Sequence, residues 1–149
     1  MRAVVQRVDN ANVTVDQQVT GAIGPGLVVL LGVHADDTAK DIRWLAEKII
    51  HLRIFNDEKG VMNRSLIDEN GQLLVVSQFT LYADCRKGRR PSWHGAAPPD
   101  KAEQRYQEFI QECTRLGVLP QTGQFQADMT VSLTNNGPVT MLLDSHKTF

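Results

Sequence analysis

Two short polar segments hold the residues whose types and spacing could support chemistry. The first, SQFT, consists of Ser77, Gln78, Phe79 and Thr80 and ends an apolar stretch. A serine or threonine hydroxyl can attack a carbonyl carbon when a nearby base activates it. The sequence offers no clear base for these hydroxyls, and side chains that simply bond to each other or to the backbone are the alternative interpretation.

The second polar segment, TNNGPVT, spans residues 134–140. Its candidate site residues are Asn135, Asn136, Gly137, Pro138 and Thr140. Glycine accepts unusual backbone angles, while proline fixes φ and has no N–H to donate. By itself, such a Gly-Pro pair is typical of a surface turn.

Other catalytic and metal-binding patterns are absent from the sequence. The histidines are His34, His51, His94 and His146. They show no HExxH or paired-ligand spacing, so no metal site is expected. There is no GxSxG segment, and GAIGPG lacks the Lys-Ser/Thr pair of a phosphate-binding loop. Cys85 and Cys113 form no CxxC pair, which favours a reducing compartment, and a cytoplasmic protein without a cofactor is expected.

The composition is that of an ordinary globular chain. Its 149 residues are 42% hydrophobic and 22% charged, with a formal net charge of -1. This length suits one core, so a single domain over residues 1–149 is expected. The longest apolar run, residues 27–33, is too short to span a bilayer, and no membrane association is expected.

Positive charge is concentrated in one segment, RKGRR. It contains Arg86, Lys87, Arg89 and Arg90. The near-neutral overall charge argues against general nucleic-acid coating, and no DNA partner is expected. A local cluster of this kind suits RNA phosphates, although a solvated loop is the simpler alternative.

Hydrophobic patterning predicts an α+β fold. The expected strands are residues 2–8, 11–16, 27–34, 72–82, 124–133 and 138–145. Thr38 is expected to cap a first helix, and Asp100 a second one that carries Cys113 on its apolar face and ends at Gly117. The expected architecture is one domain with a mostly antiparallel, barrel-like sheet and two principal helices.

Taken together, SQFT and NNGPVT resemble the D-aminoacyl-tRNA deacylase family, and QRV near the start and RPSW in the basic loop extend the resemblance over essentially the whole chain. Members of that family are homodimeric editing enzymes. They hydrolyse the ester that joins a D-amino acid, or glycine, to the 3′-terminal adenosine of tRNA. The resemblance therefore implies that tRNA carrying a D-amino acid or glycine is the substrate.

The resemblance also implies roles for individual residues. The SQFT residues would line the catalytic pocket, and the cis-linked Gly137-Pro138 of one subunit would reach into the partner's pocket and exclude L-amino acids. Arg7 would hold the partner's Gly-Pro element, and Phe125 and Met129 would contact the terminal adenosine. Main-chain amides and the ribose 2′-hydroxyl would carry the chemistry.

Two alternatives remain at this point. A sister branch of the family, with a trans Gly-Pro bond, prefers L-alanyl esters. A non-catalytic, dimeric RNA-binding module that uses the RKGRR segment is the second.

Overall fold

The structure, a computed structural model, describes all 149 residues. The elements in chain order are β1 (Arg2–Val15), β2 (Gln18–Ile23), β3 (Gly26–Gly32), α1 (Ala39–His51), β4 (Phe55–Asn56), β5 (Met62–Arg64), β6 (Gln72–Ser77), the 3-10 helix η1 (Phe79–Tyr82), α2 (Pro99–Arg115), β7 (Gln121–Thr122) and β8 (Thr130–Asp144). The expected α+β fold with two principal helices is confirmed.

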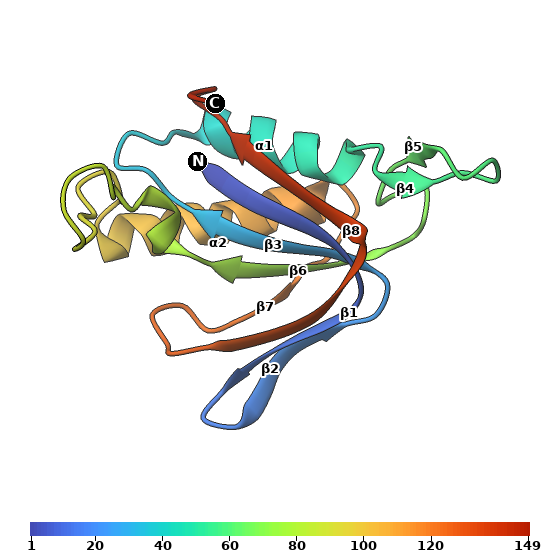
Figure 1. The fold of residues 1–149 in the computed structure, drawn as a ribbon, viewed down its shortest axis with the longest axis horizontal. Coiled ribbons are helices and arrows are strands. Elements are labelled where there is room, and N and C mark those ends of the chain that lie inside the picture. The colour runs from blue at the N-terminus through green and yellow to red at the C-terminus, as the bar shows by residue number, and fades with distance from the viewer.

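The main sheet is mixed. Strand β1 pairs antiparallel with β2, β3 and β8, whereas β3–β6 and β6–β7 are parallel pairs. Parallel neighbours require a crossover connection, and here α1 joins β3 to β6 while α2 joins β6 to β7. The sheet curls strongly, so that β2 and the adjoining parts of β1 and β8 swing away beneath the helices (Figure 1). The result is a nearly closed, barrel-like sheet.

Strand β1 is one continuous element, so the prediction of two strands separated by a turn at Asp9-Asn10 is wrong. The chain does not reverse there, because β8 stays paired to β1 on both sides of these residues. Instead β1 changes its other partner. Its first part pairs with β3 from Arg2 to Val8, and its second part pairs with β2 from Ala11 to Val15.

Strand β8 is likewise continuous, and the predicted pair of C-terminal strands is wrong. Its register on β1 passes from Val8 opposite Asn135 to Gln6 opposite Thr140. Residues 136–139 therefore face only Arg7 and bulge out of the strand. The Gly137-Pro138 pair lies in this bulge rather than in a turn between strands.

Both helices lie near the predicted positions. The carboxylate of Asp41 accepts a hydrogen bond from the backbone N–H of Thr38 at 2.9 Å, which caps α1 as expected. The second helix starts earlier than predicted: Pro98 is its N-cap residue, and Asp100 lies in its first turn. Proline suits these first positions because their N–H groups have no partner inside a helix. Gly117, with φ of 95°, follows the end of α2 as predicted.

Two apolar clusters follow from the curl of the sheet. The larger one lies between the sheet and the two helices and includes Val5, Leu45 and Phe109. The smaller one fills the curled part of the sheet and includes Val13 and Leu74. No helix is both long enough and apolar enough to cross a membrane.

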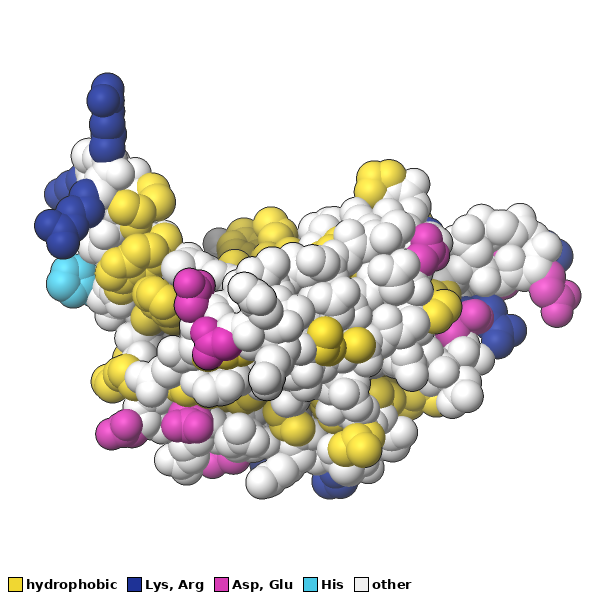
Figure 2. All heavy atoms as spheres, turned by 90° about the horizontal axis from the view of Figure 1, so that it is seen from below, with side chains coloured by type: hydrophobic (Ala, Val, Ile, Leu, Met, Phe, Trp, Pro, Cys, Tyr) yellow, Lys and Arg dark blue, Asp and Glu magenta, His cyan; other side chains and the backbone are white.

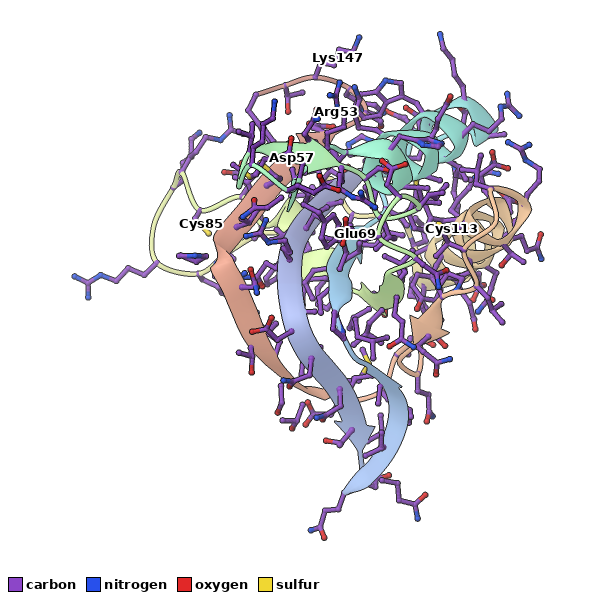
Figure 3. The ribbon with its side chains drawn as sticks, turned by 90° about the vertical axis from the view of Figure 1, so that its right-hand side faces the viewer. Arg53, Asp57, Glu69, Cys85, Cys113 and Lys147 are labelled. Atoms are coloured by element: carbon purple, nitrogen blue, oxygen red, sulfur yellow. The ribbon has the colours of Figure 1, made fainter.

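The two cysteines lie in very different surroundings. Cys113 is fully buried on α2, which confirms its predicted place in the core, and desolvation raises the pKa of its thiol to about 12. Cys85 is exposed on the loop of residues 83–98, and Figure 3 shows the two residues in separate parts of the molecule. The buried thiol of Cys113 is therefore inert at neutral pH.

Candidate active site

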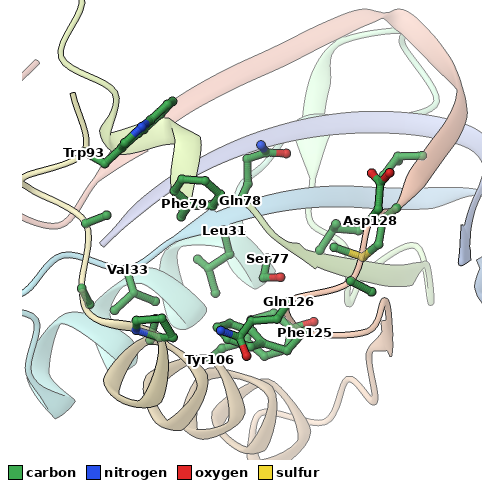
Figure 4. A pocket seen from close by; sticks show the side chains of 18 residues that line it. Leu31, Val33, Ser77, Gln78, Phe79, Trp93, Tyr106, Phe125, Gln126 and Asp128 are labelled. Carbon is green, nitrogen blue, oxygen red and sulfur yellow. The ribbon is translucent and has the colours of Figure 1, made fainter. Parts of the chain in front are cut away.

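A cavity of about 660 Å³ opens at the end of β6, between the sheet, the start of α2 and the segment before β8. It brings together five of the predicted site residues, as Figure 4 shows in part. These are Ser77, Gln78, Phe79, Phe125 and Met129. Residues that are far apart in the sequence therefore line the same cavity.

The SQFT segment reaches this cavity because β6 ends at Ser77 rather than continuing to residue 82 as predicted. The backbone N–H of Gln78 still donates to the carbonyl of Leu31 at 2.8 Å, and the chain then turns into η1. The first N–H groups of a helix have no partner within it. In η1 these unpaired groups are the backbone N–H groups of Phe79 and Thr80.

The hydroxyl of Thr80 does not line the cavity. It accepts a hydrogen bond from the side-chain amide of Gln78, whereas the Ser77 side chain lies on the cavity wall. No histidine, cysteine, lysine or arginine lines the cavity, and Asp128 is its only carboxylate. Neither hydroxyl therefore belongs to a nucleophile–base pair of the kind that activates serine hydrolases.

Tyr106 also lines the cavity, although the sequence analysis did not identify it as a site residue. Its hydroxyl donates to the carbonyl of Val75 at 2.8 Å, and its ring lies 5.9 Å from that of Phe125. Burial raises the pKa of Tyr106 well above its usual range. Tyr106 lies on the apolar face of α2, and nothing in the sequence distinguishes it from a core residue.

The predicted Gly-Pro element lies outside this cavity. The Gly137-Pro138 bond is cis, and both residues are exposed on the bulge of β8. The side-chain amide of Asn135 donates to the carbonyls of Arg7, at 2.9 Å, and Val139, at 3.0 Å, and so ties the bulge to β1. These bonds hold the exposed backbone in one conformation.

Polar side chains flank the bulge on both sides. Asn136 donates to the carboxylate of Asp9 at 2.6 Å, and Gln6 donates to the hydroxyl of Thr140 at 3.2 Å. All three of the other polar residues predicted for this site, Asn135, Asn136 and Thr140, therefore support the bulge. None of them lines the cavity.

Arg7 is buried beneath the bulge of its own chain. Its Nη1 donates to the carbonyl of Ile54 at 2.6 Å and approaches Oδ1 of Asn56 at 3.4 Å. Its Nη2 lies close enough to Gly137 that an added Cβ there would be 2.9 Å away. Arg7 therefore packs directly against the Gly-Pro element of its own chain, whereas the resemblance implied that it would hold the partner's element.

The predicted basic segment lies on the projecting loop of residues 83–98, next to the cavity. Arg86 is bound to Asp84 through two side-chain hydrogen bonds of 2.9 and 2.6 Å, and these hold the pKa of that carboxyl well below its usual range. Lys87, Arg89 and Arg90 are exposed and make no ion pair. Figure 2 shows lysine and arginine side chains gathered at this projection, beside a patch of apolar side chains.

A second polar cluster lies away from the cavity. Asp37, Asp41 and His146 place one ligand atom each within 4.8 Å of one another. Oδ1 of the buried Asp37 lies 2.5 Å from the Met1 ammonium and 3.1 Å from Nε2 of His146. The imidazole of His146 thus lies beside a buried carboxylate, which the sequence did not predict.

Comparison with known proteins gives a consistent result. The family model described as D-Tyr-tRNA(Tyr) deacylase matches residues 4–144. Proteins named D-aminoacyl-tRNA deacylase from Thermosipho africanus and Desulfotalea psychrophila are each 60% identical to this chain over 149 residues, with complete coverage of both chains. These relatives define the class as ester hydrolases that act on charged tRNA.

Solved structures agree with this fold. A structure described as c-Myc DNA Unwinding Element Binding Protein superposes with a TM-score of 0.92 at 41% identity, over 97% of this chain and 98% of that one. A probable eukaryotic D-amino acid tRNA deacylase superposes with a TM-score of 0.82 at 18% identity, over 95% and 97% of the two chains, and supports the fold alone. The chain belongs to the D-aminoacyl-tRNA deacylase family, and its activity is the hydrolysis of D-aminoacyl-tRNA esters.

Proposed function

We propose that the active site is composite, with the cavity of one subunit closed by the Gly137-Pro138 bulge of a second copy of the chain. The observation that carries this proposal is the separation of two rigid features within one chain. The cavity is lined by Ser77, Gln78 and Phe79 but by no residue of the bulge, and the bulge is exposed. A homodimer with two-fold symmetry would form two such sites.

The bulge is suited to act as a steric wall. Gly137 has no side chain, so its backbone can approach a substrate closely. The hydrogen bonds of Asn135 and the packing of Arg7 brace the wall against displacement. A wall of main-chain atoms cannot avoid a clash by changing rotamer.

This wall would select by handedness. If the amino group and carbonyl of the substrate are fixed, an L side chain projects toward the wall while a D side chain projects away from it. Rejection by a clash can discriminate more strongly than an apolar pocket that gains a little from each methylene. Glycine has no side chain and passes the filter, so glycine mischarged on tRNA(Ala) is also a substrate.

The chemistry would rely on the main chain and on the substrate. The N–H groups of Phe79 and Thr80 have no partner within η1 and would stabilise a developing oxyanion, an effect commonly worth about 3–4 kcal/mol per donor. No histidine lines the cavity, and no hydrogen bond joins its one carboxylate, Asp128, to Ser77. Ser77 and Gln78 would therefore position the ester rather than attack it. The 2′-hydroxyl of the terminal ribose then positions or activates the attacking water.

The remaining predicted residues would hold the RNA. Phe125 and Met129 line the cavity and offer apolar contacts to the terminal adenosine. Lys87, Arg89 and Arg90 lie on the adjacent loop and suit the phosphates of the acceptor end. Arg86 contributes less, because Asp84 already neutralises it.

Mixing two inactive variants tests the composite site. Gly137→Ala damages only the bulge, and Ala127→Trp fills the cavity from a loop residue that lines it. A heterodimer would carry one intact site, because it combines an intact cavity with an intact bulge from the other chain. After random exchange of subunits, about a quarter of the wild-type activity is expected.

The control is each variant alone, taken through the same exchange procedure. Heterodimer formation is verified with two affinity tags of different mass. If heterodimers form and no activity returns, each site is built within one chain and the composite arrangement is wrong.

The salt dependence of tRNA binding tests the basic loop. Replacing both Arg89 and Arg90 by Ala is expected to weaken binding and to reduce the slope of log affinity against log salt by roughly one unit per lost phosphate contact. Lys40→Ala combined with Arg43→Ala removes the same charge from α1 and serves as the control. An unchanged slope in the loop variant would show that the loop is merely solvated.

A further inference from the structure

Two large aromatic side chains are exposed together at the mouth of the cavity. The side chains of Phe79 and Trp93 are 58% and 40% exposed, and their ring centroids lie 5.1 Å apart in an edge-on arrangement. Both residues line the cavity, and Figure 4 shows them side by side at its rim. Exposing two such rings costs hydrophobic free energy, so an occupant that covers them would gain it.

The backbone around Trp93 is held firmly. The preceding residue, Ser92, exchanges two backbone hydrogen bonds with Asp84, of 2.8 and 3.1 Å. On the other side, Ala96 donates to the carbonyl of Trp93 at 3.0 Å and Ala97 donates to that of Val33 at 2.9 Å. A ring on such a support loses little conformational freedom when a ligand covers it.

The charge around the aromatic pair indicates the chemistry of its ligand. Lys87, Arg89 and Arg90 are exposed on the same loop and have no carboxylate partner. Figure 2 shows positive and apolar side chains together on this projection. A flat, apolar ring that carries a phosphate matches this combination, and an unpaired nucleotide is such a group.

We propose that Phe79 and Trp93 form a stacking platform for the base of the nucleotide that immediately precedes the terminal adenosine of tRNA. This inference rests on the proposed function, in which the terminal adenosine lies inside the cavity. The next nucleotide then emerges at the rim, where the aromatic pair stacks its base and the loop cations bind its phosphate. Trp93 acts as a positioning residue and takes no part in the chemistry.

Tryptophan fluorescence tests the contact directly. The chain has two tryptophans, so Trp44→Phe leaves Trp93 as the only one. The probe is an RNA minihelix with an unpaired 3′ end, compared with the same minihelix that lacks only the base of the penultimate nucleotide. We expect saturable quenching of Trp93 by the first RNA and little quenching by the second. Equal quenching by both RNAs, or none by either, would overturn the proposal.

Kinetics on the same two RNAs, charged with D-tyrosine, separate stacking from a structural role. Trp93→Ala is expected to raise KM by about 5- to 100-fold on the complete substrate with little change in kcat, because base–aromatic stacking is sequence-tolerant and strong. On the substrate without the penultimate base, Trp93→Ala should cause little further loss. Trp93→Phe should restore most of the affinity, and Trp44→Ala is the matched control.

The same loss on both substrates would show that Trp93 only supports the fold. A loss that follows the size of the amino acid instead of the presence of the base would place the ring against the substrate side chain, and would also overturn the proposal. Failure of the composite site has a different signature, since it abolishes activity recovery in mixed dimers and leaves the base-dependent quenching intact.

Discussion

Gly137→Ala is expected to lower kcat/KM for D-tyrosyl-tRNA by on the order of 100-fold, because a displacement of about 1 Å at a reacting site can have this effect. Gly137 has φ of 114°, a conformation that side chains disfavour. A Cβ there would lie 2.8 Å from Cγ2 of Val139 and 2.9 Å from Nη2 of Arg7. Since Val139 and Arg7 are both buried, the exposed bulge must move instead.

Gly60→Ala is the matched control for this variant. Gly60 also has a positive φ, of 76°, but an added Cβ would meet nothing within 4 Å. Its substitution carries backbone strain without a clash, and activity should stay close to that of the wild type. Steady-state deacylation assays and circular dichroism should be performed on both variants. If Gly137→Ala is folded and fully active, the bulge has no part in the active site.

A tRNA that ends in 2′-deoxyadenosine and is charged on its 3′-hydroxyl should react more slowly by on the order of 100-fold, because positioned proton transfer commonly contributes at least that much. The physical reason is the lack of a protein base beside Ser77 in the cavity. Binding must be measured in parallel, since loss of a hydrogen bond to the ribose could weaken association without changing the chemistry.

Thr80→Ala is the companion variant for this substrate. Its hydroxyl accepts a hydrogen bond from Gln78, so its removal should disturb the pocket and lower activity by no more than about tenfold, as the loss of one hydrogen bond would. If the deoxy substrate reacts at the normal rate while a folded, tRNA-binding Thr80→Ala is inert, the substrate-assisted mechanism is wrong. A threonine nucleophile would then be the better explanation.

Sequence patterns predicted the helices and the fold class well because these depend on local periodicity and capping. The Thr38 cap and the buried Cys113 followed directly from such local signals. Strand boundaries were predicted less well. Asp9-Asn10 and Gly137-Pro138 have the composition of turns, but long-range pairing between β1 and β8 keeps both segments in continuous strands. Propensity cannot reveal a partner strand that is distant in the sequence.

The site was predicted in part. Ser77, Phe79, Phe125 and Met129 do share a cavity, although they are far apart in the sequence. The motifs that identify the family carried this prediction, since no spacing rule connects the segments. Trp93 was missed as a site residue, because only the folded chain brings its loop to the ring of Phe79.

The most direct test of the handedness filter compares D-tyrosyl-tRNA with L-tyrosyl-tRNA, prepared on the same tRNA and treated with the same concentration of enzyme. The two substrates differ only in the configuration of one carbon, so the comparison tests handedness while the tRNA and the side chain stay the same. We expect rapid hydrolysis of the D ester, hydrolysis of glycyl-tRNA as well, and survival of the L ester. Comparable hydrolysis of the D and L esters would contradict the filter formed by Gly137 and Pro138.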